Sequence, residues 1–249
     1  MASSLNMNTL RYSRQTVLPA IGNAGQEKLA AARILIIGAG GLGNPAALYL
    51  ATSGLGHITI SDFDTVDASN LPRQTLYREI DCDKPKAEIL ALRLHDANPT
   101  VTAVGINRRL ERAALTTEVQ GADVILDCTD NFRSRWLINE VCYQQQKPLV
   151  TGAAIRFEGQ LSVFRHDRSN QPCYRCLYSE DDESLDDCAG QGILAPVAGT
   201  IGSMMATETI KVVLDLESAL AGKLWVYDGM AGDSRLLGIK KRDDCPVCS

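Results

Sequence analysis

A run of glycines directly between a short apolar segment and a helix-like segment is the feature that most limits the fold of this chain. Residues 33–37 are Arg, Ile, Leu, Ile and Ile, a short β-branched run that predicts a strand. Asn44 and Pro45 follow the glycines, and we expect them at the N-cap and the first position of a helix over residues 46–52. A tight turn without a ligand is one interpretation, but this order favours a phosphate-binding loop. Its glycines are Gly38, Gly40, Gly41 and Gly43.

Strand-like and helix-like segments alternate through the first part of the chain. Such alternation is typical of right-handed βαβ units, so we expect a Rossmann-like, mainly parallel sheet with helices on both faces. No repeat or linker divides the sequence, which predicts a single α/β domain over residues 1–249, with its nucleotide-binding part at about 30–155. Beyond the first strand and helix, strands are predicted at residues 57–61, 101–106, 122–128 and 148–153, and helices at 85–97 and 132–145.

The pattern changes after Gly159. A strand is predicted at residues 160–164 and a long helix at 196–214. Two late strands, at 224–227 and 234–239, should extend the sheet in the antiparallel sense. Residues 178–191 are acidic with few apolar positions, which predicts a mobile crossover loop.

Polar residues suited to a nucleotide follow the predicted strands. Asp62 ends the second strand, where its carboxylate can accept hydrogen bonds from ribose hydroxyls, although a strand-end cap is an alternative role. Arg73 and Lys86 supply two cations and Asn70 an amide, a set that suits a triphosphate better than the diphosphate bridge of a dinucleotide. Taken one at a time, these cations would be interpreted as solvated surface charges.

Asp130 follows another buried strand, together with Asn131. Ligands of parallel α/β sheets bind outside the carboxyl ends of the strands, so Asp130 is placed to hold Mg²⁺ beside phosphates. The alternative is that Asp130 caps the helix over residues 132–145, but Asn131 can take that position instead.

Overall charge and composition exclude several classes of partner. The net charge is −5, from 25 basic and 30 acidic residues, and it gives no reason to expect nucleic acid or an anionic membrane. No run of about 18 apolar residues is present in the sequence. Residues 1–14 lack the basic start and apolar centre of a secretory signal, so we expect a cytoplasmic protein.

Two cysteine pairs carry the spacing of a zinc site. Each pair is separated by two residues, and four thiolates make a closed tetrahedral site that predicts a structural zinc clip on the C-terminal extension. Redox disulfides are the alternative, but neither pair opens a helix after a strand, as the thioredoxin motif does. The pairs are Cys173 with Cys176 and Cys245 with Cys248.

Taken together, these motifs resemble the E1-like adenylyltransferases of ubiquitin-like sulfur carrier proteins, the MoeB/ThiF/HesA family. The resemblance covers nearly the whole chain. Residues 62–66 (DFDTV) and 152–160 (GAAIRFEGQ) are more similar to the MoeB branch, which serves molybdopterin synthesis, than to the ThiF branch of thiamine synthesis. The other stretches that carry it are residues 10–15, 38–43, 69–74, 84–86, 127–131 and both cysteine pairs.

The resemblance implies a reaction, a partner and a set of site residues. The reaction is ATP-dependent adenylylation of the terminal Gly carboxylate of a Gly-Gly carrier tail, with release of pyrophosphate, in molybdopterin synthesis or, alternatively, in thiamine synthesis. The carrier-binding and zinc part spans about 156–249. A homodimer is implied, in which Arg14 reaches the site of the other subunit. Nucleotide binding falls to Ser69, Asn70, Asn131 and the glycine loop with Asp62, and catalysis to Arg73, Lys86 and Asp130.

A carboxylate nucleophile agrees with the residues present. An α-carboxyl group has a pKa of about 3.3 to 3.7, so it is ionised at neutral pH and needs no general base. The chain has only 3 histidines, none of them in a motif. This scarcity disfavours an NAD-binding dehydrogenase, which usually needs an acid-base residue. A zinc-stabilised nucleotide sensor without turnover is a further alternative.

Sulfur transfer is expected to need other components. The chain stops at Ser249 without a rhodanese-like domain, so we expect a separate persulfide donor to attack the acyl-adenylate. Cys188 aligns with the loop cysteine that ThiF-like enzymes can link to their carrier. Because Asp186 and Asp187 precede it and disfavour the thiolate, we expect Cys188 to be dispensable for adenylylation.

Overall fold

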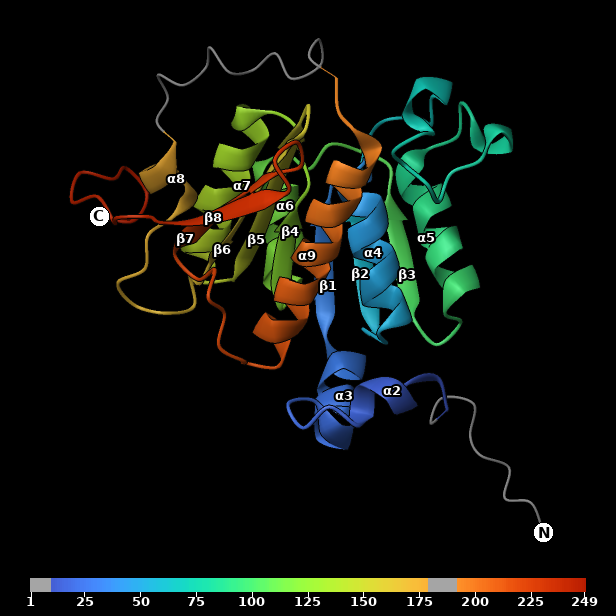
Figure 1. Cartoon of the computed structure of the whole chain (residues 1–249), viewed down its shortest axis with the longest axis horizontal. Coiled ribbons are helices and arrows are strands. Elements are labelled where there is room, and N and C mark those ends of the chain that lie inside the picture. The colour runs from blue at the N-terminus through green and yellow to red at the C-terminus, as the bar shows by residue number, and fades with distance from the viewer. Residues whose placement is uncertain (1–9, 179–191) are drawn as a thin grey trace.

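An eight-stranded sheet runs through the protein in the order β3-β2-β1-β4-β5-β6-β7-β8 (Figure 1). The computed structural model describes residues 10–178 and 192–249. The strands are β1 (Arg33–Ile37), β2 (His57–Ser61), β3 (Thr102–Ile106), β4 (Val124–Asp127), β5 (Leu149–Ile155), β6 (Glu158–Phe164), β7 (Lys223–Asp228) and β8 (Asp233–Gly238). The α-helices are α2 (Ser13–Thr16), α3 (Gly22–Ala31), α4 (Gly43–Thr52), α5 (Lys86–Ala97), α6 (Arg112–Gly121), α7 (Phe132–Gln144), α8 (Tyr174–Leu177) and α9 (Ala195–Val213). Two short 3-10 helices, Ala68–Asn70 and Glu79–Asp81, lie between β2 and α5.

The first five strands are parallel. In the centre, Ile36 of β1 pairs with Ile60 of β2 on one side and with Leu126 of β4 on the other. β3 joins β2 and β5 joins β4 in the same sense. The Rossmann-like prediction is therefore confirmed, and the carboxyl ends of five strands meet at one edge of the sheet.

The remaining strands are antiparallel, as predicted for the two late ones. β5 turns directly into β6 through Arg156 and Phe157, and Arg156 has a positive φ of 52° at this tight turn. β7 pairs with β6, and β8 closes the sheet at its edge with all of its side chains exposed. Strands β6, β7 and β8 thus continue the sheet past its parallel part as an antiparallel extension.

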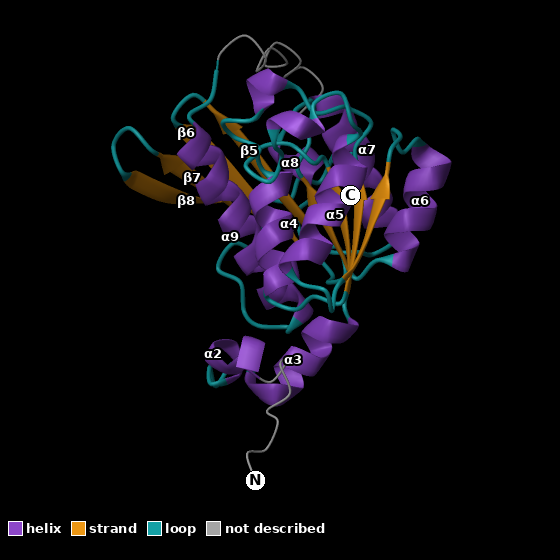
Figure 2. Cartoon of the chain, turned by 90° about the vertical axis from the view of Figure 1, so that its right-hand side faces the viewer, coloured by secondary structure: helices purple, strands orange, loops and turns teal. Residues whose placement is uncertain are grey.

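Helices cover both faces of the sheet, as Figure 2 shows. Helices α4, α5 and α9 pack on one face, and α6 and α7 on the other. β1 follows this division, because Ile34 and Ile36 belong to the first buried cluster and Leu35 to the second. Successive side chains of a strand point to opposite faces of the sheet, and both faces of β1 are buried.

Four α-helices in the described part of the chain lie where the sequence pattern gave no prediction. α2 and α3 precede β1, α6 links β3 to β4, and the short α8 lies between β6 and α9. Only Leu115 and Val119 of α6, and only Gly25 and Leu29 of α3, are buried, so the apolar periodicity that reveals a helix is weak. Within the described ranges, no helix has the length and apolar character needed to cross a bilayer.

Candidate functional site

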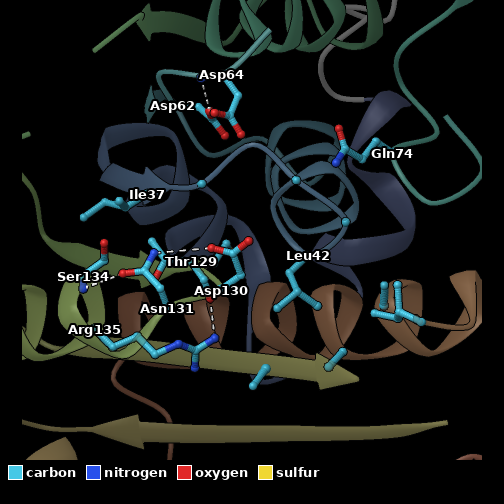
Figure 3. Close-up of a pocket in the computed structure, with 18 of the residues that line it drawn as sticks. Ile37, Leu42, Asp62, Asp64, Gln74, Thr129, Asp130, Asn131, Ser134 and Arg135 are labelled. Atoms are coloured by element: carbon cyan, nitrogen blue, oxygen red, sulfur yellow. Dashed lines mark hydrogen bonds between the residues drawn. The ribbon is translucent and has the colours of Figure 1, made fainter. Parts of the chain in front are cut away.

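A cavity of about 1260 Å³ opens at the carboxyl edge of the parallel strands. Its wall comes from segments far apart in the sequence, and it takes in the glycine loop and the residues that follow β2 and β4 (Figure 3). The end of β5, the start of β6 and the start of α9 extend it on one side. Topology therefore gathers most of the predicted site residues around one space.

The backbone of the glycine loop packs closely against neighbouring backbone carbonyl groups. Gly38 has a positive φ of 98°, and a Cβ there would lie 2.7 Å from the carbonyl oxygen of Cys128. A Cβ on Gly43 would overlap the carbonyl oxygen of Gly38. Gly40 and Gly41 have room around them and line the cavity, so their missing side chains leave the backbone accessible to a phosphate.

The predicted cap of α4 is wrong. The helix begins at Gly43 with Leu42 as its N-cap residue, so Asn44 and Pro45 lie inside the first turn. Asn44 is fully buried; its Nδ2 donates to the Ala39 carbonyl at 2.8 Å and its Oδ1 accepts from the Leu76 N–H at 3.1 Å. The glycines alone make the turn, which frees Asn44 to tie the loop to the segment beyond Gln74.

Asp62 lies beside the glycine loop with both carboxylate oxygens engaged. Oδ2 accepts from the Ala39 N–H at 2.7 Å and Oδ1 from the Asp64 N–H at 2.8 Å. Burial raises the pKa of Asp62, and the two N–H groups and Lys86 offset only part of that rise. Because each carboxylate oxygen has two lone pairs, both can still accept from a hydroxyl group on the cavity side.

Two cations and an amide lie on the same wall. Lys86 is the first residue of α5; its side chain is 7% exposed, and its Nζ lies 3.2 Å from Asp64 Oδ2. Arg73 donates from Nη1 to the Ser69 carbonyl at 3.1 Å, and Asn70 accepts from Gln74 at 2.8 Å. Ser69, Asn70, Arg73 and Lys86 all line the cavity, as do the loop glycines at 38, 40 and 41.

Asn131 caps helix α7, and Asp130 is left on the cavity wall. Asn131 is the N-cap of α7, since its side chain accepts from the Ser134 N–H at 2.9 Å. Asp130 is exposed and lines the cavity, with the Asn131 amide 3.4 Å from its Oδ1. An exposed carboxylate beside a phosphate-sized space suits Mg²⁺, which prefers carboxylate and phosphate oxygens.

Among the predicted catalytic residues that the structure describes, Arg14 does not join this wall. Arg14 lies on α2, which packs beyond the amino end of β1, away from the edge that carries the cavity (Figure 1). Cys188 lies outside the described residues. Cys128 does line the cavity, but burial raises the pKa of its thiol, so it stays neutral and is a poor nucleophile.

The two cysteine pairs come together in a separate cluster. The four sulfur atoms all lie within 4.8 Å of one another. The Cys173 and Cys245 sulfurs are 3.6 Å apart, and those of Cys176 and Cys248 are 3.3 Å apart. Zinc–sulfur bonds of about 2.3 Å in a tetrahedron place sulfurs about 3.8 Å apart, so this donor set fits zinc. None of these four cysteines lines the cavity.

Several residues of the site had no signal in the sequence. Asp127 is completely buried at the end of β4, and Arg135 of α7 is 8% exposed beneath the loop after that strand. The Tyr77 hydroxyl, also buried, reaches the carbonyls of Ala39 and Lys86 at 2.9 and 3.2 Å. Such contacts join residues that are distant in sequence, and no local motif records them.

Comparison with known proteins places this architecture in a family. The ThiF family model matches residues 12–247. The chain is 42% identical over 248 residues to the molybdopterin-synthase adenylyltransferase of Salmonella typhimurium, covering 100% of this chain and 99% of that protein. It is 42% identical over 239 residues to the sulfur carrier protein ThiS adenylyltransferase of Escherichia coli, covering 96% of this chain and 94% of that protein.

Two further similarities extend the comparison. The SAMP-activating enzyme E1 of Haloferax volcanii is 40% identical over 251 residues, and the match covers 100% of this chain and 92% of that protein. The fold is shared with Escherichia coli MccB, solved with AMPCPP and MccA, at a TM-score of 0.82 and 24% identity over 97% of this chain and 75% of that one. The match of the family model over nearly the whole chain, with full-length relatives at about 40% identity, shows that this protein belongs to the ThiF family.

Proposed function

We propose that this enzyme uses ATP to adenylylate the terminal Gly carboxylate of a ubiquitin-like sulfur carrier protein, forming an acyl-adenylate and pyrophosphate. One observation carries the proposal. A glycine loop, a ribose-side carboxylate and two cations line a single cavity in which no described lining residue is a histidine. Such a site can bind a triphosphate and neutralise its charge, but it offers no imidazole base. A nucleophile that is already ionised, such as a carboxylate, needs no such base.

The chain's own residues provide for ATP binding. Asp62 would accept from the ribose hydroxyls while its bonds to the Ala39 and Asp64 N–H groups hold it in place. The backbone at Gly40 and Gly41 would approach the phosphates at the start of α4. In this arrangement the ribose and the phosphates are bound by two structural segments that already touch each other.

Charge neutralisation falls to Lys86 and Arg73. Two anions, the carrier carboxylate and the α-phosphate, must come together, and negative charge accumulates on the departing pyrophosphate. Buried or partly buried cations placed where this charge develops lower the barrier. Lys86 already has its ammonium group fixed by Asp64, so little reorganisation is needed when the phosphates arrive.

Asp130 is the residue that would hold Mg²⁺. When bound, the ion supplies charge compensation for the phosphate oxygens. The carboxylate is exposed on the cavity wall and its neighbouring residue Asn131 already caps α7, so Asp130 itself is free of the capping role.

The carrier tail would enter from the side of the antiparallel extension. The cavity continues along Ala153 to Ile155 at the end of β5, Gly159 of β6, and Leu194, Ala195 and Ala198 at the start of α9. A Gly-Gly tail has no side chains, so it suits a narrow passage between a strand and a helix. The carrier would then bind to the part of the chain at about 156–249, with the zinc clip stabilising that part.

The motifs at residues 62–66 and 152–160 favour a carrier of the molybdopterin type. The further components are a separate persulfide donor for the carrier thiocarboxylate, and a second copy of this chain that supplies Arg14. A cytoplasmic location fits these partners. The thiamine-type carrier is the second candidate, supported by the equal identity of the ThiS adenylyltransferase of Escherichia coli.

Carrier-dependent exchange of labelled pyrophosphate into ATP tests the proposal. Exchange should appear with a Gly-Gly-ended carrier and vanish with the same carrier lacking its two terminal glycines. Comparison of molybdopterin-type and thiamine-type carriers at equal concentration then separates the two branches. Tight binding of NAD without binding of ATP, or ATP binding without exchange for any carrier, would contradict the proposal.

A further inference from the structure

A buried arginine lies directly beneath the loop that carries Asp130. Arg135, in the first turns of α7, is 8% exposed. Its Nη2 donates to the Gly152 carbonyl at 3.0 Å and also to the Thr129 carbonyl, as Figure 3 shows for the loop contact. The Thr129 carbonyl lies in the loop after β4, and the Gly152 carbonyl lies in the middle of β5. One guanidinium nitrogen therefore ties together the two chain segments between which the cavity opens.

Buried carboxylate and hydroxyl groups keep this guanidinium charged and in place. Burial lowers the pKa of Arg135, but its neighbours, with Asp127 the largest contributor among them, together raise the pKa above its ordinary value. Asp127 is completely buried and accepts from the Thr129 N–H at 3.0 Å, the Thr129 hydroxyl at 2.6 Å and the Thr151 hydroxyl at 3.1 Å. The loop after β4 is thus held from within by one buried anion and one buried cation.

Tyr174 connects this arrangement to the cysteine cluster. It directly follows Cys173 and begins α8, the short helix between the first two cysteines. Its side chain interacts with the Arg135 guanidinium and helps to raise the pKa of that group, and its N–H donates to Asn139 Oδ1 of α7 at 2.9 Å. Tyr174 and Arg135 both line the cavity, although the cysteines themselves do not.

We propose that Arg135 is a positioning residue for adenylyl transfer, which fixes the loop at residues 128–131 and hence the Asp130 carboxylate, and that Tyr174, the residue after Cys173, orients it. This inference rests on the proposed function. Because the Thr129 carbonyl belongs to the peptide that leads into Asp130, its bond to Arg135 sets the direction of the next side chain. The cysteine cluster then acts on the chemistry through the Tyr174 side chain, in addition to stabilising the fold.

Arg135→Lys and Tyr174→Phe test the two links separately. Lysine keeps the charge, but its shorter side chain does not place a nitrogen where Arg135 Nη2 contacts both carbonyls, and phenylalanine removes one oxygen atom. We expect kcat for pyrophosphate exchange to fall about 100-fold for Arg135→Lys, the scale expected when a reacting group is misplaced by about 1 Å. For Tyr174→Phe we expect about tenfold, the scale of one hydrogen bond to a charged group. Zinc content per chain should stay at the wild-type value in both.

A second readout needs no turnover. Calorimetric titration with ATP in the absence of carrier, repeated over a range of Mg²⁺ concentrations, reports how well Asp130 is placed. Arg135→Lys should raise the Mg²⁺ concentration that gives half of the full ATP affinity. On an Asp130→Asn background the same substitution should change ATP affinity by less than about twofold, because residues that act through one another are not additive.

Matched controls separate positioning from simple loss of stability. Arg112→Lys alters an exposed arginine of α6. Its side chain pairs at 2.7 Å with Glu140 of α7, the helix that also carries Arg135. Tyr143→Phe removes a hydroxyl from a tyrosine of α7 that packs against the cysteine cluster but does not line the cavity. Both controls should keep wild-type kcat and Mg²⁺ dependence.

The inference is overturned if Arg135→Lys and Tyr174→Phe lower only the melting temperature while kcat and the Mg²⁺ dependence per folded molecule match the wild type. It is also overturned if Arg135→Lys weakens ATP binding equally with and without Asp130. If Arg135→Lys does not fold, the kcat and Mg²⁺ dependence of Tyr174→Phe alone test the inference. Absence of exchange in the wild type with every carrier would contradict the proposed function instead, and the ATP titrations would still test Arg135.

Discussion

Single residues of the site were predictable where they follow a strand, and unpredictable where they act through a distant partner. Asp62, Lys86 and Asp130 each stand at the end of a strand or the start of a helix, and parallel topology brings such positions to one edge. Asn44 shows the opposite case. Its local pattern indicated a helix cap, but its side chain is buried and bonded to Ala39 and Leu76. Pairings of that kind are decided by tertiary packing.

Lys86→Ala should remove exchange without unfolding the protein. The ammonium group pairs with Asp64, whose side chain is 52% exposed, so loss of the pair should cost less than about 1 kcal/mol of stability. Without the cation, charge on the departing pyrophosphate is not neutralised, and we expect the exchange rate to fall at least about 100-fold. Thermal unfolding and exchange would be measured on the same sample. Lys28→Ala on α3 is the control, and near-normal exchange in Lys86→Ala would refute the assigned role.

The burial of His166 predicts that the protein loses stability in mild acid. The side chain is 6% exposed between Phe164 and Tyr143, and neither ring nitrogen has a hydrogen-bond partner among the described residues. Burial lowers its pKa from 6.5 to about 4. Since the folded state disfavours the protonated form, the neutral histidine stabilises the fold above about pH 6.5. This contribution is lost as the pH falls toward 4, by roughly 2 kcal/mol at pH 5.

Urea unfolding of wild type and His166→Phe at pH 7.5 and 5 would measure this effect. The phenylalanine cannot titrate, so its unfolding free energy should fall less between the two pH values, by roughly 2 kcal/mol. Zinc content is determined at each pH, so that metal loss is not mistaken for histidine protonation. Equal pH dependence in the two proteins would show that His166 is not the group responsible.

At the scale of elements, the alternation of strands and helices determined most of the fold. The five parallel strands and helices α5, α7 and α9 lie within a few residues of their predicted positions, because each has a strong apolar pattern. The sequence missed α2, α3, α6 and the four-residue α8, which bury few residues. It also predicted that the cysteine pairs would meet, and they do, because pairs 72 positions apart are brought together when β7 and β8 extend the sheet beside β6.

Removal of one cysteine should weaken this part of the sheet. In Cys173→Ala three thiolates remain, a closed tetrahedral site cannot form, and the free energy of metal binding no longer supports the fold. A loss of about 3 kcal/mol would lower the melting temperature by roughly 6–12 °C for a domain of this size. Calorimetry and metal analysis check the result, with Cys82→Ala, outside the cluster, as the control. Purified wild-type protein without zinc would contradict the clip.

At the scale of the whole molecule, one chain does not bring Arg14 to the cavity that is lined by the other predicted catalytic residues of the described chain. The cavity lies at the carboxyl edge of the sheet, whereas α2 with Arg14 packs beyond the amino end of β1 (Figure 1). Within the described residues Arg14 is exposed and takes no part in the cavity wall. If Arg14 takes part in the reaction, it must act at the site of another copy of the chain, which is the arrangement that the family resemblance implies. The proposed role of Arg14 therefore requires a dimer.

Subunit mixing tests this requirement directly. Arg14→Ala and Asp130→Ala should each be inactive alone. In a mixed dimer, one site combines a wild-type Asp130 with the wild-type Arg14 of the other chain, so that site should work. Random exchange makes half of the dimers mixed, each with one intact site, and activity should recover to about a quarter of the wild-type value per total site. Differently tagged chains verify the exchange. Verified mixed dimers without activity would show that Arg14 and Asp130 serve the same chain, or that Arg14 has no part in the reaction.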